Sequence, residues 1–134
     1  DVVDKYENGM NIINQDIVEF NPKKKYDLII SISTLEHIGW DESPRDDTKI
    51  PRVIMNLKSL LSENGMMVIT FPIGYNQALD NHRKLGKIRF QNEYYMKRLG
   101  ENHWTEAKWN EVKLSTFGEP FEGSNGLVIG MDRK

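Results

Sequence analysis

The 134-residue chain contains no cysteine, which excludes disulfide bonds and thiolate metal sites. It has no apolar run near the roughly 20 residues that a membrane-spanning helix needs. Its net charge is only −2, which gives no general attraction to nucleic acid or anionic membranes, so we expect neither as a partner. The start DVVDKYENG has no signal-peptide pattern, and with the missing cysteine this favours a reducing, cytoplasmic location.

What the chain does contain is typical of a globular protein. Hydrophobic residues make up 38% and charged residues 28% of the sequence, a balance that can support a buried core. No repeat, low-complexity tract or internal linker divides it. We therefore expect one domain over residues 1–134.

The first two thirds of the chain read as alternating strands and helices. DVV and MNIINQDIVEF predict two short strands, and YDLIISIS predicts a strand that is apolar on both faces, as in a central strand covered by helices on both sides. Val53, Ile54, Leu57, Leu60 and Leu61 recur at helical spacing from Ile50 to Leu61, and Asn64-Gly65 is expected to end this helix. MMVITFP then predicts a strand parallel to YDLIISIS.

The last third is less regular. NQALDNHRKLG predicts a short helix, and RFQNEYYMKRL fits either a helix or a strand. We expect a strand near Lys108 to Val112, and GLVIGMD predicts the closing strand.

Polar clusters follow three of the predicted strands. They are Asp4 to Glu7, Asp16, and Ser33 to Glu42. Ligands of open α/β sheets bind at the carboxyl ends of the parallel strands, so these clusters are expected to share one site. Turn formation is the competing interpretation for Asp4 and Asp16, because aspartate favours turns and helix caps.

The segments KKKYDLIISISTLEHIG and LKSLLSENGMMVITFPIGYN resemble the second half of a class I S-adenosylmethionine-dependent methyltransferase. The resemblance covers residues 1 to 75 and, less closely, the closing strand GLVIGMD. It implies a Rossmann-like α/β sheet that is mostly parallel with an antiparallel last strand. It also implies S-adenosylmethionine as the cofactor.

The resemblance assigns roles to named positions. Asp4, or else Glu7, would hold the cofactor ribose, and Asp16 with the Ile17 backbone would face the adenine. The methionine end would be lined by three residues, which are Ser33, Thr34 and Leu35. Four residues would lie toward the methyl acceptor, which are Glu36, Trp40, Tyr75 and Asn76.

His37 is the candidate general base, since imidazole titrates near neutral pH. Capping or hydrogen bonding of the local backbone is the competing interpretation. The acceptor implied by the resemblance is an unidentified small molecule or saccharide. A metal site could be assembled from His37, Asp41, Glu42, Asp46 and Asp47, but their spacing matches no ligand pattern, and we expect no metal.

One departure from the family is large. The glycine-rich loop after the family's first strand, an acidic residue followed by Gly-x-Gly, is absent, and in the family that first strand lies between the second and fourth strands. The chain is therefore expected to be the portion of a methyltransferase domain that lacks its N-terminal part, or a domain whose sheet closes by direct pairing of its second and fourth strands. A homo-oligomer in which another chain completes the sheet is a further alternative.

The departure also keeps other functions open. A methyltransferase-like domain without catalysis, serving as a structural or partner-binding module, is the main alternative to an enzyme. Another nucleotide-binding Rossmann-like enzyme has less support, because no Gly-x-Gly-x-x-Gly or phosphate-binding loop is present.

Overall fold

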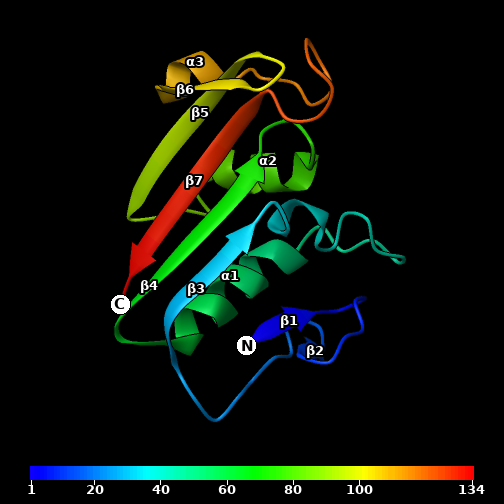
Figure 1. Ribbon diagram of the computed structural model, residues 1–134, viewed down its shortest axis with the longest axis vertical. Coiled ribbons are helices and arrows are strands. Elements are labelled where there is room, and N and C mark those ends of the chain that lie inside the picture. Colours follow the sequence, from blue (N-terminus) through cyan, green and yellow to red (C-terminus); the bar gives the residue numbers. More distant parts are fainter.

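The computed structural model describes residues 1–134 and divides the strands between two sheets (Figure 1). β1 (Val2–Asp4) and β2 (Ile12–Asn14) pair in parallel as a small separate sheet. The larger sheet has the strand order β3-β4-β7-β5-β6. Its members are β3 (Tyr26–Ile32), β4 (Leu61–Pro72), β5 (Asn92–Gly100), β6 (His103–Ala107) and β7 (Gly126–Arg133).

The strand directions confirm the predicted fold class. β3 and β4 are parallel, and β7 lies between β4 and β5 and is antiparallel to both. β3, β4 and β5 therefore run in one direction, with the last strand of the chain inserted against them. β6 adds an antiparallel hairpin partner to β5, which settles the undecided segment RFQNEYYMKRL as a strand.

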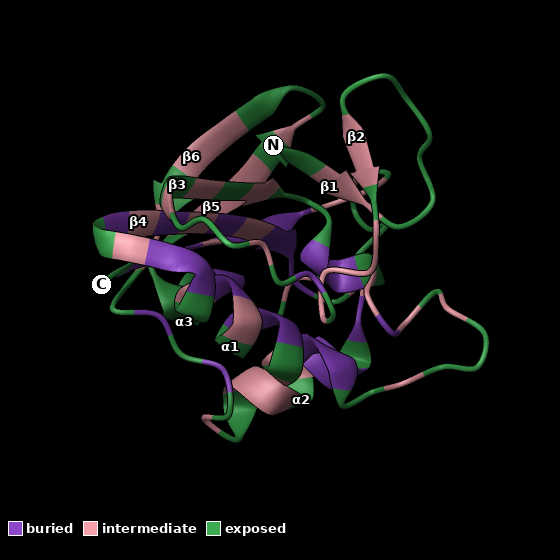
Figure 2. Cartoon of the chain, turned by 90° about the horizontal axis from the view of Figure 1, so that it is seen from below, coloured by how far each residue is buried: buried purple, intermediate pink, exposed green.

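The helices lie on one side of the larger sheet (Figure 2). They are α1 (Lys49–Leu60), α2 (Gln77–Lys84) and the short α3 (Trp109–Val112), and a 3-10 turn, η1, spans Leu35–His37. None of the helices is long and apolar enough to cross a membrane. α1 forms where predicted, because its apolar positions recur every three or four residues and Pro51 falls in its first turn.

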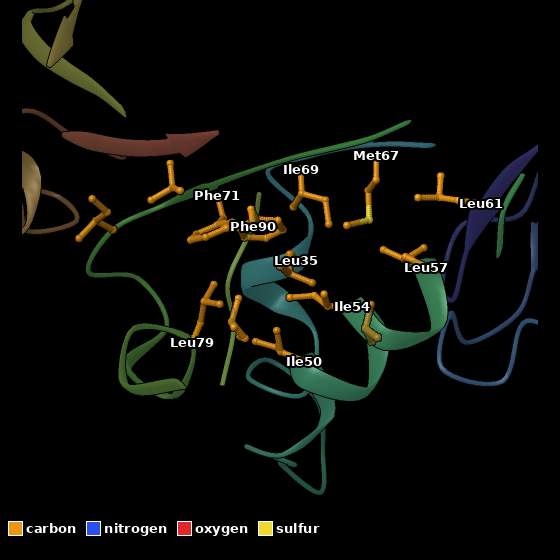
Figure 3. Packing of buried hydrophobic residues seen from close by; sticks show 14 of the residues in the cluster. Leu35, Ile50, Ile54, Leu57, Leu61, Met67, Ile69, Phe71, Leu79 and Phe90 are labelled. Carbon is orange, nitrogen blue, oxygen red and sulfur yellow. The ribbon is translucent and has the colours of Figure 1, made fainter. Parts of the chain in front are cut away.

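The core lies between these helices and the inner face of the sheet (Figure 3). Met67, Ile69 and Phe71 alternate along β4 and are fully buried against α1 and Leu35 of η1. Leu79 of α2, with Phe90 ahead of β5, closes the other end of the same cluster. The turn that carries Glu36 and His37 is thus anchored directly in the core.

The prediction that YDLIISIS is a central strand covered on both faces is wrong. β3 forms the edge of the larger sheet, and only Ile29 on its inner face packs against the core. Leu28, Ile30 and Ile32 on the other face are 50%, 58% and 67% exposed. A run of aliphatic residues shows that both faces of a strand are hydrophobic, but it does not show whether a second layer covers the outer face.

Two local predictions are also wrong. The strand expected near Lys108 to Val112 is the short helix α3, and β6 ends just before it at Ala107. α1 ends at Leu60, four residues before the Asn64-Gly65 turn. That turn lies instead inside a register shift of β4 opposite Tyr26, and Asn64 adopts the positive φ of 67° that the pair predicts.

The two sheets are not joined through their backbones. β1 corresponds to the family's second strand, and it pairs only with β2. Direct pairing of β1 with β3, one of the expected ways to close the sheet, therefore does not occur. Side chains make the connections instead. Asn56 of α1 donates to the carbonyl oxygens of Ile17 and Phe20, and the Tyr26 hydroxyl donates to Asp1.

Candidate functional site

A cavity of about 450 Å³ lies between the small sheet and β3. Its floor is apolar, with Phe20 from the small-sheet side, Ile29 of β3 and Leu57 of α1. Its polar rim is formed by the segments that follow β1, β2 and β3, as expected for an α/β sheet. The structure brings together six of the predicted residues along this cavity, which are Asp4, Asp16, Ile17, Thr34, Leu35 and His37.

Asp4 ends β1 with one carboxylate oxygen engaged and the other free of hydrogen bonds within the chain. Its Oδ1 accepts from the backbone amides of Tyr6 and Glu7, both at 2.8 Å. The Glu7 and Tyr6 amides hold the pKa of the Asp4 carboxyl below its usual value. The residue therefore stays ionised, with Oδ2 available as an acceptor. Glu7, the alternative ribose ligand, is exposed and does not line the cavity.

Asp16 belongs to a partly buried ion-pair cluster that we call the Lys49 cluster, consisting of Lys5, Asp16, Glu42 and Lys49. The Lys49 ammonium lies 2.5 Å from Asp16 Oδ2 and 2.6 Å from Glu42 Oε2. Lys5 bridges the same two carboxylates at 3.2 and 2.9 Å. The cluster thus joins the segments after β1, β2 and β3 to α1.

The cluster keeps both carboxylates ionised. Burial alone would raise the pKa of Asp16, but hydrogen bonds from Lys49 and the Val18 amide lower it. Glu42 behaves in the same way, with Lys49 and Lys5 lowering its pKa against the effect of burial. Glu42 in turn raises the pKa of Lys5. Asp16 therefore faces the cavity as an already paired carboxylate, and the Ile17 backbone amide is the group beside it without a partner in the chain.

The segment after β3 turns sharply away from the sheet. Ser33 adopts a positive φ of 46°, and its amide donates to the carbonyl of Thr70. Ser33 and Thr34 are exposed, whereas Leu35 is 1% exposed and packs in the core. Thr34 and Leu35 line the cavity, and Ser33 lies just outside its lining.

Glu36 and His37 have different environments although they are adjacent. Glu36 is only 3% exposed, its Oε2 has no hydrogen-bond partner, and burial raises the pKa of its carboxyl. His37 is half exposed at the cavity rim, and its Nδ1 lies 2.6 Å from Asp41 Oδ2. Tyr75 donates a hydrogen bond to the same oxygen at 2.7 Å.

The remaining acceptor-side residues do not line the cavity. Trp40 is covered by the Arg45 guanidinium, 3.3 Å from the ring centroid. Asn76 is fully buried and caps α2, accepting from the Leu79 amide and donating to the carbonyl of Glu36. Asn76 therefore holds the loop after β3 in place. Of Trp40, Tyr75 and Asn76, only Tyr75 bonds to a carboxylate at the cavity rim, that of Asp41.

The carboxylates considered for a metal site are dispersed among cation partners. Glu42 pairs with Lys49, Asp46 with Arg52, and Asp47 with Arg45. No group of three or more His, Asp or Glu side chains is arranged to hold a metal ion. Only His37 and Asp41 of the proposed set meet.

Two charged residues of the site were missed by sequence reasoning, namely Lys5 and Lys49. Lys49 is the first residue of α1, where a solvent-exposed polar side chain is expected, yet it is only 6% exposed. A signal was available in the three carboxylates expected at one edge, because converging carboxylates require a cation when they are buried.

The comparisons with known proteins give fold-level similarity only. No protein-family model and no curated protein matches the chain. Two solved structures of N-methyltransferase NodS from Bradyrhizobium japonicum WM9 are similar to it. The complex with S-adenosyl-L-homocysteine has 15% identity and a TM-score of 0.48 over 92% of this chain and 53% of NodS. The second has 14% identity and a TM-score of 0.47 over 92% of this chain and 58% of NodS. The chain thus spans little more than half of NodS, and at this similarity nothing about its ligand follows from NodS.

Proposed function

We propose that the chain is a class I methyltransferase domain that binds S-adenosylmethionine and methylates a small-molecule or saccharide acceptor. The observation that supports this most is the convergence of the segments after β1, β2 and β3 on one cavity. Its volume of about 450 Å³ lies within the usual range for small-molecule pockets. Its mixture of an apolar floor and a polar rim suits a nucleoside with a charged tail.

The residues present fit the nucleoside end of the cofactor. Asp4 offers a free, ionised carboxylate oxygen, which can accept hydrogen bonds from ribose hydroxyls. The Ile17 amide offers a donor for an adenine ring nitrogen, while Asp16 is held by Lys49 and supports the wall. Thr34 and Leu35 would lie along the methionine end.

The cofactor brings an activated methyl group, so the chain's residues need only align the acceptor, exclude water and take up a proton where one is released. His37 at the cavity rim is the residue proposed to accept that proton. Glu36 is buried behind it and has no free path to solvent, so it is not assigned a role in binding.

Replacing Asp4 with asparagine tests the site. The amide oxygen of D4N can still accept from the Tyr6 and Glu7 amides, so the turn is retained, but the free oxygen becomes a donor. We expect S-adenosyl-L-homocysteine to bind about 10-fold or more weakly to D4N, the cost of one hydrogen bond to a charged group. Isothermal titration calorimetry would measure it.

Glu7→Gln is the matched control, since Glu7 neighbours Asp4 but lies outside the cavity. Its affinity is expected to equal that of the unsubstituted chain. A loss confined to E7Q would move the ribose site to Glu7. An absence of binding by the unsubstituted chain would argue against the enzyme.

The alternative of a non-catalytic partner-binding module has one observation in its favour. Asp16, the residue implied for adenine, already has both lysines of the Lys49 cluster as partners. A module of this kind would bind no cofactor in the same titration while remaining folded.

The outer edge of β3 supports a proposal about assembly. Its backbone has no strand partner, and Leu28, Ile30 and Ile32 beside it are exposed and also line the cavity. We propose that, in the ligand-free chain, a second copy completes the sheet there. Sedimentation velocity should then show a concentration-dependent dimer that Ile32→Lys abolishes, and a monomer at all concentrations would contradict it.

A further inference from the structure

A hydrogen-bonded chain of side chains surrounds His37 and is not used by cofactor binding. The carboxylate oxygen Oδ2 of Asp41 lies 2.6 Å from His37 Nδ1 and accepts the Tyr75 hydroxyl at 2.7 Å. The Tyr75 ring meets the imidazole edge-on at a centroid distance of 5.0 Å and is itself packed against Phe117 at 4.8 Å. Two direct contacts, with Asp41 and with Tyr75, therefore fix the position of the imidazole ring.

The donor and acceptor roles in this chain are set by chemistry. Burial alone would raise the pKa of Asp41, but the hydrogen bonds from His37 and Tyr75 lower it, so Asp41 is ionised and can only accept. Asp41 also raises the pKa of Tyr75 to about 12, so the phenol keeps its proton and donates. The proton of neutral His37 must therefore sit on Nδ1, which leaves the Nε2 lone pair free.

Nothing within the chain occupies Nε2. No hydrogen bond reaches it, and the nearest acidic atom is Oε1 of Glu36 at 3.9 Å, beyond hydrogen-bond distance. Nε2 is thus free to accept a proton from a molecule in the cavity.

We infer that Asp41 and Tyr75 are positioning residues that hold His37 as a general base with Nε2 free, and that the acceptor is a group that loses a proton when it is methylated. This rests on the proposed function. A hydroxyl or ammonium group becomes a better nucleophile as it loses its proton, whereas a thioether or carboxylate needs no base. The acceptor atom would bond to the methyl carbon as the sulfur–methyl bond breaks, leaving a neutral thioether, and the acceptor's proton would pass to His37 Nε2.

The test is the tautomer of His37 in the free chain, which ¹⁵N NMR reads directly because protonated and unprotonated ring nitrogens resonate far apart. The spectrum should be recorded at a pH well above the ordinary imidazole pKa of about 6.5. The other histidines are internal references. His82 has Nε2 against the carbonyl of Asp47, which requires the opposite, Nε2–H tautomer, and His103 has no side-chain hydrogen bond.

We expect a single Nδ1–H tautomer for His37, the reverse of His82. Asp41→Ala should convert it to a mixture resembling His103, and Asp41 is exposed enough for the fold to survive. Asp47→Ala is the matched control, an exposed carboxylate of the same loop whose side chain pairs with Arg45 and touches no histidine ring. It should leave the His37 spectrum unchanged.

The outcomes separate this inference from the proposed function. An Nε2–H or mixed tautomer of His37 in the unsubstituted chain overturns the inference about Asp41 and Tyr75. An unchanged His37 spectrum in D41A overturns it as well. An intact Nδ1–H tautomer in a chain that binds no S-adenosyl-L-homocysteine supports the tautomer assignment while overturning the proposed function.

Discussion

Replacing Lys49 with glutamine should lower the free energy of unfolding by about 3 kcal/mol, because it leaves the partly buried carboxylates of Asp16 and Glu42 without their main cation, which is itself buried. Removing one partner of a buried ion pair costs about 3 to 5 kcal/mol in general. The lower end applies here, because Lys5 still pairs with both carboxylates and is itself more exposed. Urea unfolding at neutral pH would measure the change.

Arg52→Gln is the control on the same helix. Arg52 pairs with Asp46 at the surface, where both side chains are exposed, so its loss should cost much less than the loss of Lys49. Equal effects of K49Q and R52Q would show that the Lys49 cluster is hydrated and contributes no more than a surface pair.

The pH dependence of the K49Q effect has a definite sign. Asp16 and Glu42 have pKa values below their unfolded values, so the stability they contribute is present above the unfolded pKa of about 4 and is lost as the pH falls through the lowered values. The difference between the two proteins should therefore be full at neutral pH and shrink below about pH 4. A difference that grows on acidification would contradict the ion pairing.

Ile69→Ala is expected to lower the free energy of unfolding by about 2 to 5 kcal/mol, the usual cost of truncating a buried isoleucine. Ile69 lies on the inner face of β4, has no solvent exposure and belongs to the core cluster under α1 (Figure 3). The residues of this cluster come from the sheet and from all three helices, so the site cannot collapse easily around the missing atoms. Denaturant unfolding of the two proteins measures the loss.

Ile30→Ala is the same substitution on the neighbouring strand. Ile30 is 58% exposed on the face of β3 that lines the cavity, and its truncation should cost about 1 kcal/mol or less in the ligand-free chain. A concentration-dependent loss as large as that of I69A would mean that another molecule covers this face in solution. The pair therefore measures both the core and the proposed assembly.

The sequence predicted the sheet well where periodicity carries the information. The strands at Tyr26–Ile32 and Gly126–Arg133, helix α1 and residues 66–72 of β4 lie where their apolar patterns indicated. β4 begins earlier, at Leu61, which the helical spacing had assigned to the helix. The segment after Ala107 was missed, since four residues of helix show no full period.

The site was predictable in place but not in detail. Polar residues after three strands indicated one shared edge, and the cavity lies there. The pairing of Asp16 with Lys49 was not predicted, because it joins positions 33 residues apart in the sequence. Asn76 was assigned to the acceptor for the same reason, whereas its buried amide caps a helix.

The absence of a backbone ladder between β1 and β3 makes the cavity a seam whose width is not fixed. Hydrogen-bonded strands are held about 4.8 Å apart, but these two are joined only by the reach of side chains such as Lys49 and Asn56. The first 20 residues make no strand pairing with the larger sheet, so side-chain contacts such as the Lys49 cluster and the packing of Phe20 are what hold them to it. A ligand that contacts both sides of the cavity would hold the first 20 residues against the larger sheet in place of strand pairing. Amide hydrogen exchange in those residues would then slow as more ligand binds.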